Sequence, residues 1–204
     1  MAARAGVDRR SVRLRGIILA AGAGERMGGP KAMLLVQGEP LARIHARRLK
    51  EAGCEDVVLV TRPELTAFFV REGIAVASRA ADPAGSLAVG LGAMPDAEGA
   101  LVVTPVDAWP VRTSTIACLA AALAAGADAA TPRFGDRGGH PVVLRASVLR
   151  GFAAAPRPLR DLLAGFGARR VRVDVDDPAV ATDLDSPAQF VELAGEEVRF
   201  WNGS

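Results

Sequence analysis

With 204 residues, half of them hydrophobic, the chain is long enough to bury one sizeable core and too short for two ordinary domains. The formal net charge is only +2 and aromatic residues make up 4% of the chain, which argues against a general nucleic-acid binder. No apolar stretch reaches the length of a membrane span, because Gly, Pro or charged residues interrupt the longest candidates. We therefore expect a single α/β domain that binds neither nucleic acid nor membranes.

The basic residues gather at the start of the chain. We predict a flexible basic arm over residues 1–15 and a single domain over residues 16–204. A secretory signal peptide is the alternative, but the apolar run after the arm is short and contains glycines, which weaken a hydrophobic helix. Cys54 and Cys118 lie in apolar segments that we predict to be helical, without metal-binding spacing. We expect both to be reduced core residues of a cytoplasmic protein.

Short apolar runs alternate with amphipathic segments along the chain, which is typical of parallel strands joined by helices. Strands are predicted over residues 17–20, 57–61, 74–77, 100–104, 127–131, 141–145 and 169–175. Helices are predicted over residues 40–52, 64–73, 85–94, 114–125, 158–165 and 187–194. This order predicts a three-layer α/β architecture, in which a mostly parallel sheet carries helices on both faces.

A glycine-rich segment, Gly22-Ala-Gly-Glu-Arg-Met-Gly-Gly-Pro-Lys31, directly follows the first predicted strand. In such a sheet, ligands bind beyond the carboxyl ends of the strands, and glycines let backbone N–H groups come close to phosphate oxygens. Arg26 and Lys31 add positive charge that suits a polyphosphate. We interpret the segment as a triphosphate-binding loop; a strand-to-helix turn without a ligand is the alternative.

This loop does not match either of two common phosphate-binding motifs. A dinucleotide fingerprint needs a third glycine where Met27 stands, and an acidic residue after the second strand, where Thr61 and Arg62 stand. A P-loop needs Gly-Lys-Ser/Thr, whereas proline precedes Lys31 and alanine follows it. An NADP-dependent oxidoreductase is thus supported only by the paired glycines and Arg62.

The segment Leu19-Ala-Ala-Gly-Ala-Gly-Glu-Arg-Met-Gly-Gly-Pro-Lys31 resembles the signature of the MobA-like nucleotidyltransferases, and most closely that of the molybdenum cofactor cytidylyltransferases. The resemblance continues in the family's order through Gly85-Ser-Leu87, Val103-Thr-Pro-Val-Asp107, Arg137-Gly-Gly-His-Pro-Val-Val143 and Thr182-Asp-Leu-Asp-Ser-Pro187. It implies a Rossmann-like nucleotidyltransferase fold. It also implies a reaction in which a small phosphorylated acceptor takes a nucleoside monophosphate from a Mg²⁺-bound nucleoside triphosphate and pyrophosphate is released.

The same resemblance implies where the nucleotide binds and which base it carries. The first loop would hold the triphosphate, and the segment at positions 85 and 86 would lie near the base. The nucleotide-binding residues implied are Leu19, Ala20, Ala21, Gly22, Gly24, Lys31, Gly85 and Ser86. In the family, paired alanines at the positions of Ala20 and Ala21 go with CTP, whereas guanylyl-transferring relatives tend to have Ala-Gly-Gly. This implies CMP transfer from CTP to an acceptor such as molybdopterin.

Two aspartates are predicted to bind the Mg²⁺ ion. Asp107 ends a buried strand on the ligand side of the sheet, where a carboxylate is a suitable oxygen ligand, although it could instead be a turn residue. Asp185, with Asp183 in reserve, matches a family segment whose aspartate completes the metal site, or else it belongs to a turn that caps the last helix. The predicted catalytic residues are Lys31, Arg26 and Asp107, of which the two cations would stabilise the transition state and the leaving pyrophosphate.

Two residues are candidates for contact with the acceptor. His140 matches a Gly-His-Pro segment that lies beside the acceptor in the family, although its glycine and proline neighbours could hold it for structural reasons. Trp109 would stack on a flat acceptor such as a pterin, or pack as an apolar anchor. His45, on a basic helix face, is expected to be solvated.

The sequence departs from the family directly after Asp107, where the usual Gln-Pro or His-Pro is replaced by Ala108-Trp109. This departure keeps other acceptors open, namely a sugar phosphate or a methylerythritol phosphate. It also keeps open a non-catalytic nucleotide-binding accessory protein for a molybdoenzyme partner. We expect the protein to be a monomer.

Overall fold

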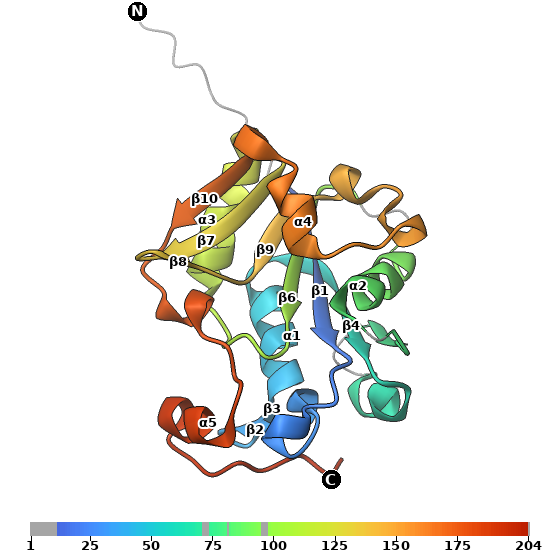
Figure 1. Ribbon diagram of the computed structural model, residues 1–204, viewed down its shortest axis with the longest axis vertical. Coiled ribbons are helices and arrows are strands. Elements are labelled where there is room, and N and C mark those ends of the chain that lie inside the picture. The colour runs from blue at the N-terminus through green and yellow to red at the C-terminus, as the bar shows by residue number, and fades with distance from the viewer. Residues whose placement is uncertain (1–11, 71–73, 81, 95–97, 204) are drawn as a thin grey trace, which may run out of the picture.

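The computed structural model describes residues 12–70, 74–80, 82–94 and 98–203, and its centre is an eight-stranded sheet (Figure 1). The path through the sheet is β10-β7-β9-β6-β1-β4-β5, with β8 paired to β7. The strands of the sheet are β1 (Leu14–Ala20), β4 (Cys54–Thr61), β5 (Ile74–Ala77), β6 (Ala100–Pro105), β7 (Ala129–Phe134), β8 (Arg137–Gly138), β9 (Val142–Arg145) and β10 (Arg170–Asp174). A separate ribbon pairs β2 (Leu35–Val36) with β3 (Glu39–Pro40).

The sheet is mostly parallel. β1 pairs in parallel with β4 and β6, β4 with β5, and β7 with β10. β9 is antiparallel to both β6 and β7, so it is the strand that reverses direction within the path. The carboxyl ends of β1, β4, β5 and β6 therefore meet at one edge of the sheet, where ligands of this architecture bind.

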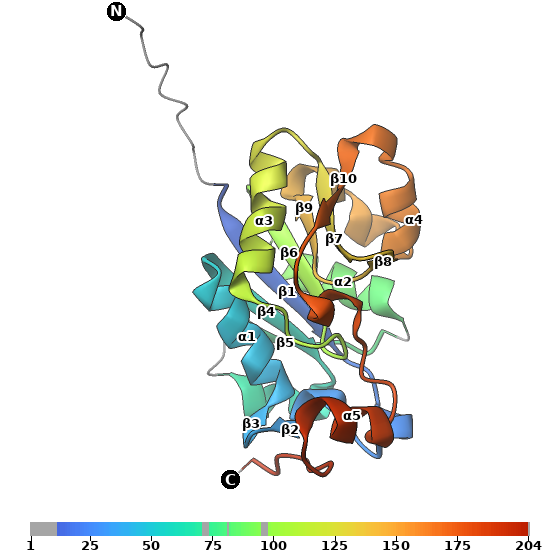
Figure 2. The ribbon, with the colours of Figure 1, turned by 90° about the vertical axis from the view of Figure 1, so that its left-hand side faces the viewer.

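Helices cover both faces of the sheet (Figure 2). α1 (Leu41–Glu51) and α3 (Thr113–Ala124) lie on one face, and α2 (Pro83–Gly92) and α4 (Leu159–Ala164) lie on the other. Because successive strand residues point to opposite faces, Ile17 joins the apolar cluster under α2, while Ile18 joins the cluster under α1. The predicted fold class, a Rossmann-like α/β fold with a mostly parallel sheet between two helical layers, is confirmed.

α5 (Pro187–Ala194) lies apart from these layers, at the end of the molecule that also carries β2 and β3 (Figures 1 and 2). It begins with Ser186, whose side chain accepts a hydrogen bond from the N–H of Gln189, and it ends at Gly195 in the left-handed conformation. Phe190 is completely buried and anchors the helix in the core.

Some elements differ from the sequence predictions. β1 begins at Leu14, so Leu14 and Arg15 belong to the domain and not to the predicted arm, because they pair with β4 and β6. Residues 1–11 of that arm lie outside the described residues. The helix predicted over 64–73 is a 3-10 helix, Pro63–Phe69, and residues 71–73 are also outside the described part.

The prediction for the cysteines is half wrong. Cys54 is buried as expected, but it begins strand β4 and does not lie in a helix, and burial raises the pKa of its thiol to about 12. Cys118 is exposed on α3, so it is not a core residue. None of the helices in the described ranges combines the length and the apolar composition that a membrane span requires.

Candidate active site

The loop after β1 is built from two short 3-10 turns, Glu25–Met27 and Lys31–Met33. The carbonyl of Gly24 accepts hydrogen bonds from the N–H groups of Met27 and Gly29, at 2.8 and 3.2 Å. Gly24 has a φ of +68°, and a Cβ there would lie 1.9 Å from the carbonyl oxygen of Gly29. Only glycine fits this position, because any side chain would force the loop open.

The loop brings two cations to the carboxyl edge of the sheet. The Nζ atom of Lys31 lies 3.3 Å from Oδ2 of Asp107 and 3.9 Å from Oδ1 of Asp185. The Nη2 atom of Arg26 lies 3.1 Å from the same Oδ1 of Asp185. Four residues that the sequence predicted for catalysis and metal binding are therefore adjacent in space.

These ion pairs differ in their exposure. The side chain of Lys31 is 12% exposed, whereas those of Arg26 and Asp185 are 77% and 55% exposed. An ion pair as exposed as Arg26–Asp185 contributes about 0–1 kcal/mol to stability. Stability therefore does not explain why acidic and basic side chains gather at this edge, whereas a charged ligand would.

The position of Asp107 follows from the backbone around it. β6 ends at Pro105, and the chain then pairs with a segment from near the C-terminus, residues 182–184. The N–H of Leu184 donates to the carbonyl of Asp107 at 2.7 Å, and the N–H of Trp109 donates to the carbonyl of Thr182 at 2.8 Å. This antiparallel pairing brings Asp185 near Asp107, so that both carboxylates lie within 4 Å of the Lys31 ammonium group, at 3.9 and 3.3 Å.

Asp185 does not cap the last helix. The N-cap of α5 is Ser186, so the side chain of Asp185 is free to face Arg26 and Lys31. The sequence had left open that Asp185 belongs to a turn that caps this helix. The side chain that caps it is that of Ser186.

Asp183 lies beside the same charges. Desolvation raises the pKa of Asp183, and the negative charges of Asp107 and Asp185 raise it further, while His140 and Lys31 oppose the shift. Among the described residues, no three His, Cys, Asp or Glu side chains are arranged as a complete metal site. A Mg²⁺ ion held here would thus need oxygens beyond the protein's own, which is the usual situation when a nucleotide's phosphates complete the coordination.

A cleft with a volume of about 180 Å³ opens beside these charges. Of the predicted nucleotide-binding residues, Leu19, Ala21, Gly22 and Ser86 line it, and Asp107 is at its side. Its remaining lining residues come from the start of α2 and the end of β6: Ala80, Asp82, Pro83, Pro105 and Val106.

Besides Lys31, three predicted nucleotide-binding residues do not line this cleft. Ala20 is 1% exposed within β1, and Gly24 shapes the turn of the loop. Gly85 lies in the first turn of α2, where its N–H donates to the N-cap carboxylate of Asp82 at 2.8 Å. The structure thus places these three beside the cleft lining, in supporting positions.

His140 and Trp109 border the carboxyl edge from the β6 and β9 side. The N–H of His140 donates to the carbonyl of Val180 at 3.0 Å, and its buried Nδ1 atom has no hydrogen-bond partner among the described residues. Burial lowers the pKa of His140, although Asp183 and Asp107 act in the opposite direction. Trp109 is half-buried and packs against the core cluster under α1. The apolar-anchor role predicted for Trp109 thus has a structural basis, and stacking on an acceptor stays a prediction.

The prediction that His45 is solvated is wrong. His45 is 4% exposed, and its Nε2 atom lies 3.0 Å from the carbonyl oxygen of Ala108. Burial lowers the pKa of His45 to about 4. The sequence held a signal for this burial, because His45 stands four residues after Leu41 and four before Leu49, on the apolar stripe of α1.

A second feature was not predicted from the sequence: residues 199–201, here called the C-terminal strap, run beside the glycine-rich loop of residues 22–31, here called the phosphate loop after its predicted ligand. The N–H of Leu35 donates to the carbonyl of Arg199 at 2.8 Å, and the N–H of Trp201 donates to the carbonyl of Met33 at 2.7 Å. Between them, Phe200 forms an isolated bridge with Leu34. The strap therefore fixes the backbone directly after Lys31.

Trp201 anchors the strap to the rest of the domain. Its ring packs against Phe68 and Phe69, with centroids 5.7 and 5.9 Å apart. The guanidinium carbon of Arg43 lies 4.1 Å from the centre of the Trp201 ring, in cation–π geometry. The anchor thus connects the strap to α1 and to the helical turn after β4.

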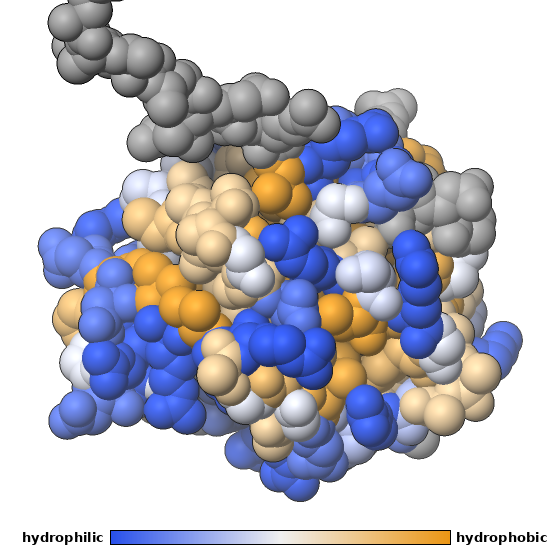
Figure 3. All heavy atoms as spheres, turned by 90° about the horizontal axis from the view of Figure 1, so that it is seen from above, coloured by the Kyte–Doolittle hydropathy of each residue, from blue (hydrophilic) through white to orange (hydrophobic). Residues whose placement is uncertain are grey.

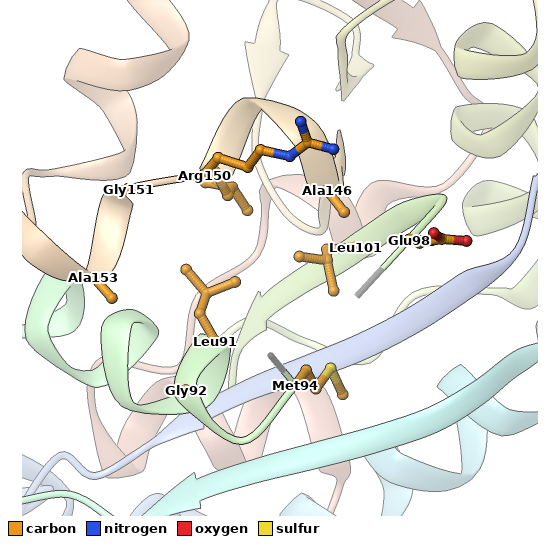
Figure 4. Close-up of a pocket in the computed structure, with 10 residues that line it drawn as sticks. Leu91, Gly92, Met94, Glu98, Leu101, Ala146, Arg150, Gly151 and Ala153 are labelled. Carbon is orange, nitrogen blue, oxygen red and sulfur yellow. The ribbon is translucent and has the colours of Figure 1, made fainter. Parts of the chain in front are cut away.

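A larger cavity of about 470 Å³ opens at the opposite, amino-terminal edge of the sheet (Figure 4). Leu91, Met94 and Leu101 form apolar walls, and Glu98 and Arg150 stand at its sides. Seen toward that end, the surface mixes hydrophilic and hydrophobic side chains (Figure 3). None of the residues that line this cavity belongs to the glycine-rich loop of residues 22–31.

The chain is similar in sequence and in structure to known proteins. The chain is 33% identical over 190 residues to the molybdenum cofactor guanylyltransferase of Xanthomonas euvesicatoria pv. vesicatoria, which covers 89% of this chain and 94% of the relative. The structure resembles the manganese complex of Rv0371c from Mycobacterium tuberculosis, with a TM-score of 0.70, 22% identity and coverage of 90% and 99%.

It also resembles CMP:2-keto-3-deoxy-manno-octonic acid synthetase complexed with CTP, with a TM-score of 0.67, 17% identity and coverage of 90% of this chain and 97% of the other. At such identities these two likenesses establish the fold alone. The model of the MobA-like NTP transferase domain family matches residues 16–175, which include the phosphate loop and Asp107. The chain therefore belongs to the MobA-like NTP transferase domain family and is a nucleotidyltransferase.

Proposed function

We propose that the protein transfers CMP from CTP to the phosphate of a small acceptor such as molybdopterin, in a Mg²⁺-dependent reaction that releases pyrophosphate. The observation that carries this proposal is the position of the Lys31 ammonium group, between the carboxylates of Asp107 and Asp185 and beside an open cleft. This arrangement supplies positive charge for a triphosphate and oxygen ligands for its divalent ion at one place.

The residues fit a Mg²⁺ ion. Asp107 and Asp185 already hold a cation between them, the Lys31 ammonium group, and Mg²⁺ in nucleotide enzymes takes one or two carboxylates together with phosphate oxygens. Asp107 and Asp185 would hold the ion, and when bound it supplies charge that neutralises the phosphate oxygens. The manganese complex of the structural neighbour supports a divalent ion in this fold.

The chain's own residues then have distinct tasks. Lys31 and Arg26 would lie against the α-phosphate and the pyrophosphate, where negative charge increases as the reaction proceeds. An oxygen of the acceptor's phosphate forms the new bond to the α-phosphorus, and the bond from that phosphorus to the pyrophosphate oxygen breaks. No side-chain nucleophile is needed, because the acceptor phosphate is already an anion.

The identity of the base rests on Ala21. This residue lines the cleft, and its methyl group occupies space that a glycine would leave to a larger base. The pair Ala20-Ala21 favours CTP, whereas the name of the Xanthomonas relative favours GTP. We infer CTP because Ala21 is part of the cleft itself.

The acceptor is proposed to bind near His140 and Trp109. The imidazole of His140 lies near Asp183 and Asp107, and its Nδ1 atom has no hydrogen-bond partner among the described residues, while the half-buried indole of Trp109 offers a flat apolar face. Both features suit a planar heterocycle that carries a phosphate. A sugar phosphate or methylerythritol phosphate would use the histidine without needing the indole.

The experiment is an assay of pyrophosphate release by the full chain with Mg²⁺. CTP, GTP, ATP and UTP are each paired with molybdopterin, a sugar phosphate and methylerythritol phosphate. We expect turnover with CTP and molybdopterin. Turnover with GTP alone would overturn the assignment of CTP as the nucleotide. Turnover with only another acceptor would overturn the assignment of molybdopterin as the acceptor.

A non-catalytic accessory protein for a molybdoenzyme is the second candidate, and the Ala108-Trp109 departure favours it. It predicts that the wild type and Asp107→Ala bind CTP equally and show the same negligible pyrophosphate release. Calorimetric titration with CTP, with and without Mg²⁺, separates this outcome from a complete loss of nucleotide binding.

A further inference from the structure

His45 lies on α1 directly beneath the segment that carries Asp107. Its ring is buried, and Nε2 lies 3.0 Å from the carbonyl oxygen of Ala108, the residue after Asp107. Ala108 is itself 2% exposed, so its carbonyl needs a partner within the protein. The ring of His45 supplies that partner.

The ring is held in its neutral form, with the proton on the nitrogen that faces Ala108. Burial lowers the pKa of His45 to about 4, although contacts with the backbone of Ala108 and Val106 act in the opposite direction. Near neutral pH, Nε2–H therefore donates to a carbonyl oxygen that cannot donate in return. The hydrogen bond fixes the tautomer and the ring orientation.

Other hydrogen bonds hold this segment from different sides. The N–H of Val106 donates to the carbonyl of Leu19 at 2.9 Å, and the carbonyl of Asp107 accepts from Leu184 at 2.7 Å. These bonds are between backbone groups of the sheet and of the C-terminal segment. His45 adds a contact from the helical layer, at the carbonyl of Ala108, the residue after the aspartate.

We propose that His45 is a positioning residue for Asp107: by holding the Ala108 carbonyl from the α1 side, it sets the direction in which the Asp107 carboxylate enters the cleft. This inference rests on the proposed function, since it assigns His45 to the metal site of that reaction. His45 itself does not touch the nucleotide cleft or the Lys31 ammonium group among the described contacts.

The test compares two replacements of His45 with a control on the same helix. His45→Phe keeps a ring but lacks a donor, and His45→Gln keeps an N–H donor of similar reach. Arg47→Ala, at an exposed position of α1, is the control. Affinity for Mn²⁺ is measured by electron paramagnetic resonance in the presence of CTP, and kcat is measured separately from KM for CTP.

We expect His45→Phe to weaken Mn²⁺ binding and to lower kcat, each by about tenfold to a hundredfold, because loss of the group that orients a metal ligand has effects of this size. KM for CTP should change little, and His45→Gln should restore most of both losses. A change in general packing would not be rescued by glutamine in this selective way.

Wild-type Mn²⁺ affinity in a folded His45→Phe variant would overturn the inference. His45→Met, which also lacks a donor, is used if phenylalanine does not fit. A wild type without transferase activity would overturn the proposed function, while the Mn²⁺ measurement would still decide the role of His45.

Discussion

The ammonium group of Lys31 lies 3.3 Å from a carboxylate oxygen of Asp107, although the two residues are 76 positions apart. They meet because Lys31 follows β1 and Asp107 follows β6, and these two strands are parallel neighbours. Lys31 therefore reaches both the metal-binding carboxylates that we propose and the phosphates that would lie beside them.

Replacement of Lys31 by methionine should remove the charge and keep most of the side-chain volume. We expect kcat/KM for CTP to fall by about a hundredfold or more, because a lost donor to developing phosphate charge has effects of this order. Pyrophosphate release is the measurement. Lys50→Met is a matched control, since Lys50 lies on the exposed side of α1 and donates to the carbonyl of Glu55; it should behave as the wild type.

Removal of a carboxylate should affect the requirement for the divalent ion. Asp107→Asn keeps the size of the side chain and removes its charge, so we expect kcat to fall at least about a hundredfold and the Mg²⁺ concentration for half activation to rise. Excess chelator should abolish wild-type turnover, and added Mg²⁺ should restore it. Equal Mg²⁺ dependence in the variant and the wild type would show that Asp107 is not a metal ligand.

The preference for a pyrimidine base should depend on the methyl group of Ala21. Ala21→Gly enlarges the cleft, and we expect the ratio of kcat/KM for GTP to that for CTP to rise by about tenfold, the range for one methyl group in a pocket. Ala23→Gly, at an exposed position of the same loop, is the control. An unchanged ratio would mean that the base is read elsewhere in the cleft.

The sequence predicts the sheet and the position of the glycine-rich loop well because both leave local patterns. Buried parallel strands are continuous apolar runs, and the loop's glycines and cations are contiguous in the chain. The pairing of Asp107 with Lys31 followed from one further rule, that neighbouring parallel strands end at the same edge.

Features that depend on distant partners were not predicted. His45 was expected to be solvated because arginines surround it in the sequence, and its partner, the Ala108 carbonyl, lies 63 positions away. The C-terminal strap is too short for a periodic pattern, and its bonds to Met33 and Leu35 join opposite ends of the chain. The apolar stripe of α1 indicates that His45 is buried, but in both cases the hydrogen-bond partner is distant in the sequence, and no local pattern identifies that partner.

The strap should influence nucleotide binding through Gly29. A Cβ at Gly29 would lie 3.0 Å from the ring of Phe200, so Gly29→Ala should push the strap and the phosphate loop apart. We expect KM for CTP to rise and the free energy of unfolding to fall by about 1–3 kcal/mol, the usual cost of overpacking. Phe200→Leu should partly relieve the clash. The free energy of unfolding of the double variant should therefore fall by less than the sum of the decreases in the two single variants.

Gly92→Ala is the control for this pair, because Gly92 lies on α2 with open space around its Cβ position. It should leave KM for CTP unchanged. Strictly additive losses in the double variant would mean that Gly29 and Phe200 do not interact.

The stability of the protein should depend on pH through His45. Its pKa is about 4 in the folded protein, compared with about 6.5 in the unfolded chain, so between these values the unfolded state binds more protons. The contribution of the neutral ring is thus fully present above pH 6.5 and is lost as the pH falls toward 4. From pH 7 to pH 5, the free energy of unfolding of the wild type should fall by about 2 kcal/mol more than that of His45→Gln, because the glutamine at position 45 does not titrate in this range.

Urea unfolding of both proteins at the two pH values measures this difference. His140 contributes equally in the two proteins. Parallel loss of stability in the two proteins would show that His45 is accessible to protons in the folded state, which would contradict its burial beneath the Asp107 segment.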